Sequence, residues 1–85
     1  MEFEIDFRSK TPSYQQLAGK IRQAIAAGQY AADDKLPSLK RFTQETGLAQ
    51  GTVQKAIKLL EAEGLIYTVN GRGTFVTGPP RSLSA

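Results

Sequence analysis

Residues 38–64 read SLKRFTQETGLAQGTVQKAIKLLEAEG and hold two helical patterns separated by three residues. Ser38 is a typical helix cap, and the short helix that it predicts over residues 39–46 ends at Gly47, which suits a left-handed backbone. Residues 50–63 then repeat apolar side chains at intervals of three and four before a second glycine. A short helix, a tight turn and a longer helix together form a helix-turn-helix.

A third helical pattern precedes this stretch. We expect Thr11 to cap it, Pro12 to occupy its first turn and Gly28 to end it. Small and acidic residues follow as far as Pro37, and they predict a connecting loop in which Asp33-Asp34 forms a loop and capping pair. The apolar side of this first helix recurs at intervals of three and four through Tyr14, Leu17, Ala18, Ile21, Ala24 and Ile25.

Strands are expected at both ends of the chain. Residues 65–69 and 74–76 are rich in β-branched and aromatic side chains, and Asn70-Gly71 between them is a hairpin-turn signal. Near the amino terminus Phe3, Ile5 and Phe7 alternate with charged residues, which predicts a short half-buried strand. The fold class is therefore mainly α with a small β-hairpin wing (α+β): a winged helix-turn-helix of three helices, a two-stranded wing and a short N-terminal strand.

The length of 85 residues allows one compact unit, which we expect to cover residues 1–78, with residues 79–85 as a linker or tail. The opening residues mix acids with apolar side chains and lack the long apolar run of a signal peptide or membrane span. We therefore expect a cytoplasmic protein with no membrane partner.

The residue types argue against an enzyme. The chain has neither Cys nor His, which removes thiolate nucleophiles, imidazole bases and nearly every zinc site. Glu61 and Glu63 lie two residues apart on a helix and do not face one another, and the loop at residues 70–73 lacks the Lys-Ser/Thr ending of a phosphate-binding loop. Asp33-Asp34 would need further oxygen ligands to hold a metal ion. The sequence predicts no catalytic residue, no cofactor and no metal.

Positive charge is concentrated in the middle of the chain. The whole sequence carries 11 basic and 8 acidic residues, for a net charge of +3, but between residues 35 and 58 the only acid is Glu45. The basic residues of this region are Lys35, Lys40, Arg41, Lys55 and Lys58. A regional excess of this kind is typical of a surface that binds a polyanion such as nucleic acid.

The predicted third helix has a polar side suited to the major groove of DNA. Opposite its apolar stripe, an arc of roughly 140° carries basic and amide side chains and no carboxylate. Gln50 and Gln54 can pair with adenine, and the lysines of this arc can reach phosphates or guanine. The residues on the arc are Gln50, Gly51, Gln54, Lys55 and Lys58.

Two further sites extend this surface. Arg72 stands between Gly71 and Gly73 in a slender loop, where its side chain can enter a minor groove. Lys40 and Arg41 begin the second helix, where they can contact phosphates as the first helix of the motif crosses the DNA backbone.

Five blocks of the sequence resemble the signature of the GntR family of transcription regulators. They fall in order and spacing across residues 12–76 and are Leu36-Pro37-Ser38, Gly47-Leu48, Thr52-Val53, residues 59–66 and residues 71–76. The resemblance implies a winged helix-turn-helix that binds double-stranded DNA as part of a repressor. In that family this domain usually precedes a larger effector-binding and dimerising domain, and we predict no effector site within this chain.

The chain departs from the family pattern at the start of the third helix. The family often has Ser-Arg-x-Thr-Val-Arg where this chain has AQGTVQ at residues 49–54. Two arginines that commonly bind DNA in the family are therefore replaced by glutamines in this chain. Ala49 also lacks the oxygen of a Ser cap, a loss of about 1 kcal/mol. The family roles therefore carry over to Lys40, Thr52, Arg72 and Gly73 but not to Gln50 and Gln54, so no operator sequence is taken over from the family. The predicted DNA-binding residues are Ser38, Lys40, Arg41, Gln50, Gly51, Thr52, Gln54, Lys55, Lys58, Gly71, Arg72 and Gly73.

Two alternatives stay open at the level of sequence. A winged helix can also serve as a protein-docking module, with the wing or the third helix against another protein. Helix-turn-helix proteins commonly bind two-fold operators as homodimers. The N-terminal strand over residues 3–7 is a candidate dimer surface, although it could equally pack against its own wing.

Overall fold

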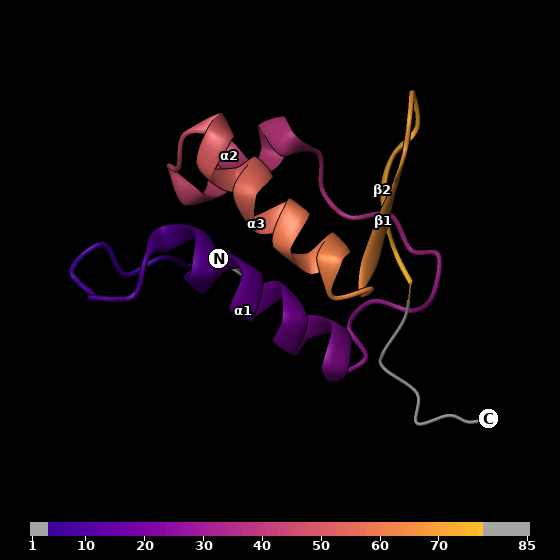
Figure 1. Cartoon of the computed structure of the whole chain (residues 1–85), viewed down its shortest axis with the longest axis horizontal. Coiled ribbons are helices and arrows are strands. Elements are labelled where there is room, and N and C mark those ends of the chain that lie inside the picture. Colours follow the sequence, from indigo (N-terminus) through magenta and orange to yellow (C-terminus); the bar gives the residue numbers. More distant parts are fainter. Residues whose placement is uncertain (1–3, 78–85) are drawn as a thin grey trace.

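The computed structural model describes residues 4–77, so the linker or tail expected at residues 79–85 lies outside the described residues. Three helices are followed by one antiparallel hairpin, which stands upright at one end of the helices (Figure 1). The elements are α1 (Ser13–Ala26), α2 (Leu39–Thr46), α3 (Gln50–Ala62), β1 (Ile66–Val69) and β2 (Gly73–Val76). This order confirms the winged helix-turn-helix.

The ends of α2 follow the predicted signals. The Ser38 hydroxyl accepts a hydrogen bond of 3.1 Å from the backbone N–H of Arg41, and Gly47 ends the helix with a left-handed φ of 77°. Helix α3 begins at Gln50 as expected, without a side-chain cap at Ala49, and its last residue is Ala62.

The cap predicted for α1 is wrong. Pro12, with φ −56° and ψ 145°, has an extended backbone and itself takes the cap position, so the helix begins one residue later, at Ser13. The Pro12 carbonyl accepts hydrogen bonds from the backbone N–H groups of Gln15 and Gln16, and no side chain caps the helix.

The core lies mainly between α1 and α3, which run side by side (Figure 1). The apolar stripe of α3 enters this core as predicted, since Val53, Ala56 and Leu60 are fully buried. At the carboxyl end of α3, Arg22 of α1 donates two hydrogen bonds to the Glu63 carboxylate, at 2.9 and 2.7 Å, in a bidentate ion pair. This hydrogen bond lowers the pKa of Glu63 and raises that of Arg22. Fully buried side chains from all three helices and the wing fill the core: Leu17, Ile21, Ile25, Phe42, Val53, Leu60 and Val76.

The segment predicted as a plain loop before α2 is in part a third member of the wing. Residues 33–36 run antiparallel to β2: Asp33 N–H donates to the Val76 carbonyl at 2.6 Å, and Leu36 N–H donates to the Thr74 carbonyl at 2.8 Å. Leu36 is buried, which draws the segment onto the core. Asp34 of the predicted capping pair does bond the backbone of this loop, because its carboxylate accepts from the Ala31 N–H at 2.8 Å. The wing is therefore joined directly to the residues that lead into α2.

The predicted N-terminal strand is wrong for the residues that the structure describes. Residues 4–7 form no strand, and Phe3 lies outside the described range. The side-chain amide of Gln16 takes the place of a partner strand, because it accepts from Asp6 N–H at 2.8 Å and donates to the Asp6 carbonyl at 2.9 Å. Ile5 is buried in the core as expected, whereas Phe7 is 66% exposed.

The two helices of the motif offer a matched test of capping. We expect Ser38→Ala to lower the free energy of unfolding by about 0.5 to 2 kcal/mol, and Ala49→Ser to raise it by about 1 kcal/mol, because each change removes or adds one cap acceptor. Urea denaturation of both variants measures these shifts. Equal stability of the wild type and the Ala49→Ser variant would show that α3 is already capped by another group.

Candidate nucleic-acid interface

The outward side of α3 is not covered by the rest of the described chain. Gln50, Gly51, Gln54, Lys55 and Lys58 are all exposed, as the helical spacing predicts. Thr52, the remaining predicted residue of this helix, is half-buried at its edge. A Cβ added at Gly51 would meet nothing within 4 Å, so the surface there is open. This side of α3 is available to a partner.

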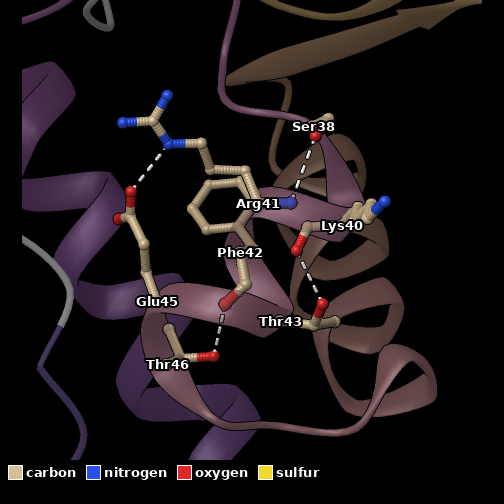
Figure 2. Close-up of polar contacts among 7 residues, drawn as sticks. All are labelled: Ser38, Lys40, Arg41, Phe42, Thr43, Glu45 and Thr46. Carbon is tan, nitrogen blue, oxygen red and sulfur yellow. Dashed lines mark hydrogen bonds and ion pairs between the residues drawn. The ribbon is translucent and has the colours of Figure 1, made fainter.

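The first turn of α2 carries two basic side chains with different surroundings. Lys40 and Arg41 leave the helix on opposite sides (Figure 2). Arg41 Nε donates to the Glu45 carboxylate at 2.8 Å, one helical turn away, and this hydrogen bond raises the pKa of Arg41. Lys40 forms no ion pair within residues 4–77. Glu45 therefore compensates the charge of Arg41, while Lys40 keeps its full charge at the surface.

Lys40 also lies next to the start of α3. An open hollow at the surface is lined by Lys40, Thr43 and Gln50. The Thr43 hydroxyl donates to the Lys40 carbonyl at 2.7 Å, which ties it to the helix backbone (Figure 2). The folded chain thus brings one predicted phosphate contact and one predicted base contact to the same point.

A larger groove runs between α2, α3 and the wing. Its volume is about 380 Å³, and its polar side chains from α3 are Gln54, Lys58 and Glu61. Thr68 donates a hydrogen bond from its hydroxyl to the Glu61 carboxylate, so helix and wing are linked across the groove floor. The remaining lining residues are Pro37, Leu39, Phe42, Ile57, Thr68 and Thr74.

From the sequence, Glu61 was considered only as a catalytic acid or base, and its place at the border of this surface was not predicted. It stands three residues after Lys58 and seven after Gln54, so helical spacing puts it on the same side of α3. The carboxylate-free surface therefore ends at Lys58, and negative charge marks its boundary toward the wing.

The wing tip has the geometry that its glycines predict. Gly71 and Gly73 both have positive φ, at 78° and 128°, and Arg72 between them is exposed. A Cβ at Gly73 would come within 2.8 Å of Lys35 Cε, so the Lys35 side chain lies across this glycine. Lys35 belonged to the predicted basic region but not to the predicted site, and the folded chain places it at the base of the tip.

Lys55 has an aromatic neighbour that the sequence reasoning did not connect to it. Its Nζ lies over the ring of Tyr14 in the first turn of α1, 4.3 Å from the ring centroid. The exposed side of α3 therefore has α1 at one edge, through Lys55, and the wing at the other, through Gln54 and Lys58.

Candidate metal clusters and membrane-spanning helices are both absent from the described part of the chain. Residues 4–77 contain no group of three or more acidic, His or Cys residues placed to hold a metal ion. Within the same range, none of the helices has the length and apolar character needed to cross a bilayer.

Comparison with known proteins identifies the family. Residues 13–76 match the family described as "Bacterial regulatory proteins, gntR family", and since this match covers most of the chain, the chain belongs to the GntR family. It is 39% identical over 74 residues to the HTH-type transcriptional repressor YtrA of Bacillus subtilis. The aligned residues cover 87% of this chain and 57% of that repressor. The chain thus spans little more than half the length of this relative.

Solved structures agree with this assignment. YtrA from Sulfolobus acidocaldarius, a GntR-family transcription factor, superposes with a TM-score of 0.85 at 38% identity, covering 94% of this chain and 84% of that one. The DNA-binding domain of AraR, solved in complex with operator ORX1, superposes with a TM-score of 0.82 at 33% identity, covering 89% and 98% of the two chains. These relatives are regulators of transcription, and they do not favour the protein-docking alternative.

The pairing of Arg41 with Glu45 leads to a prediction about charge. We expect Glu45→Gln to strengthen binding to duplex DNA at low salt, because it releases the Arg41 guanidinium for a phosphate, while Lys40→Ala weakens binding. Fluorescence anisotropy with a labelled duplex measures both changes. As a control, Glu45→Gln in an Arg41→Ala background should leave the affinity unchanged apart from the general effect of one charge, and an equal gain in both backgrounds would contradict the prediction.

Proposed function

We propose that this chain binds double-stranded DNA in a sequence-dependent manner, as the DNA-binding domain of a GntR-family transcriptional repressor. The observation that carries the proposal is the exposed, carboxylate-free side of α3 over residues 50–58, with Lys40 beside one end of it. A helix fits the major groove of B-DNA when one side packs on its own domain and the other meets the bases. The similar AraR DNA-binding domain was solved in complex with an operator, which supports DNA binding by this chain.

The chemistry of each side chain suggests its role. Gln50 and Gln54 would pair with base edges, because an amide can bond adenine N6 and N7 together. Lys55 and Lys58 would bind phosphates or guanine, and Arg72 at the wing tip over residues 70–73 would enter the adjacent minor groove. Helix α2, which follows Ser38 and ends at Gly47, would position the domain on the DNA backbone through Ser38 and Lys40. Arg41 and Thr52 would contribute at the edges of the interface. Gly71 and Gly73 give the tip its shape.

The arrangement in the whole regulator is part of the proposal. Residues 1–78 would act as one DNA-binding unit in the cytoplasm, with residues 79–85 as a linker or tail. Two copies would bind a two-fold operator as a homodimer, since helix-turn-helix domains commonly place their recognition helices one turn of DNA apart. Residues 4–7 form no strand, so the proposal does not include strand pairing between two copies through these residues.

Enrichment from a random duplex library tests the function directly. We expect a short preferred sequence, a footprint of two half-sites if two copies bind, and affinity that falls steeply between about 50 and 200 mM salt. Each Lys or Arg on a phosphate makes the slope of log K against log salt more negative by about 0.9. A pool that shows no enrichment would refute sequence-dependent binding, and an affinity that does not change with salt would refute phosphate binding by this surface.

The two glutamines should decide which bases are preferred. We expect Gln50→Ala and Gln54→Ala each to relax the preference at one or two base pairs, by about 1 to 3 kcal/mol for each lost bidentate contact, while the salt slope stays the same. Binding of each variant to all single-base changes of the enriched sequence measures this. Gln44→Ala, on α2 and exposed, is the matched control. Unaltered base preference in both variants would remove the glutamines from the readout.

A further inference from the structure

The contact between Lys55 and Tyr14 joins the exposed side of α3 to the first turn of α1. Lys55 Nζ stands 4.3 Å from the centroid of the tyrosine ring, within the range of a cation–π interaction. The ring itself is half-buried and packs against the core, and its hydroxyl accepts a hydrogen bond of 3.1 Å from the Gln15 side-chain amide. A long and flexible lysine side chain is thus held by a ring that the core fixes in place.

The ring holds the ammonium group without neutralising it. Arg41 is held by the Glu45 carboxylate, which also compensates its charge. The Tyr14 ring is uncharged, so Lys55 keeps its full positive charge, and its N–H groups that point away from the ring stay available to an anion. A side chain fixed in advance loses less conformational freedom when it binds than one that is mobile.

We propose that Tyr14 is a positioning residue for DNA binding, which holds the Lys55 ammonium at the α1 edge of α3 to receive a phosphate of the DNA backbone. This inference rests on the proposed function and adds to it a second edge of the interface. Lys58, by contrast, lines the groove on the wing side of α3. The two lysines would then contact phosphates on either side of the inserted helix.

A series of aromatic side chains of equal shape tests the role of the ring. Tyr14 is replaced by Phe and by phenylalanines with one, two and three fluorine atoms, which weaken the attraction of the ring for a cation step by step. With a duplex selected by the wild-type chain as probe, we expect Tyr14→Phe to bind like the wild type and affinity to fall along the series, by about 2- to 5-fold in all. An affinity that stays flat along the series overturns the inference.

Combination with lysine variants separates positioning from general structure. In a Lys55→Gln background, the fluorine series should have no effect, because the cation that the ring holds is gone. In a Lys58→Gln background, the series should keep its full effect, which makes this variant the matched control. Equal effects in both backgrounds would show that Tyr14 acts through the fold, and a loss already complete in Tyr14→Phe would assign the effect to the hydroxyl. Either result overturns the proposal.

The geometry can be tested in the free chain. The ring current of Tyr14 should shift the ε-methylene protons of Lys55 upfield in the NMR spectrum, and Tyr14→Leu should abolish that shift. Unshifted Lys55 protons in the wild type contradict the contact. If the wild-type chain binds no duplex, the proposed function fails and this inference fails with it. If the wild type binds and only the fluorine series is flat, the inference alone fails.

Discussion

The packing of α3 against α1 determines what the rest of the molecule can do. Burial of Val53, Ala56 and Leu60 fixes the rotation of α3 about its own axis, and that rotation decides which residues face outward. A turn of the helix by one residue would move Gln54 toward the core and carry an apolar side chain to the surface. The Arg22–Glu63 ion pair reinforces this orientation at the end of α3 farthest from the interface. The recognition that we propose for α3 thus depends on an apolar contact on its opposite side.

Much of the fold follows from local signals in the sequence. The period of the apolar residues predicted all three helices and the exposed side of α3, because burial of one side requires that spacing. Ser38 and Gly47 predicted the ends of α2 to the residue, since each forms its bond or its left-handed backbone within one turn. The hairpin was predicted with its turn at Asn70-Gly71. These features share one property, which is that a few neighbouring residues determine them.

Most of the features that the sequence did not predict depend on residues far apart in the chain. Alternation of apolar residues at the amino terminus predicted a strand, but the hydrogen-bond partner of Asp6 is the side chain of Gln16, and no pattern within residues 3–7 reveals it. The pairing of residues 33–36 with β2 and the contact of Lys55 with Tyr14 each join separate elements. The Arg41–Glu45 ion pair is a local exception that was also not predicted. Glu45 is the one acid of the basic region, and its spacing of four residues from Arg41 is the pattern that favours such a pair on a helix.

The direct link between the wing and α2 has a consequence for the DNA itself. Residues 33–36 are hydrogen-bonded to β2 and lead within two residues to the cap of α2 at Ser38, so backbone hydrogen bonds connect the hairpin directly to the helix-turn-helix. In the proposed complex, this connection would set the separation between the helix in one groove and the loop in the next. A duplex with a different groove geometry then has to bend or twist to fit, at an elastic cost that varies with the base steps being deformed. Base pairs that no side chain touches would in this way influence affinity through their stiffness.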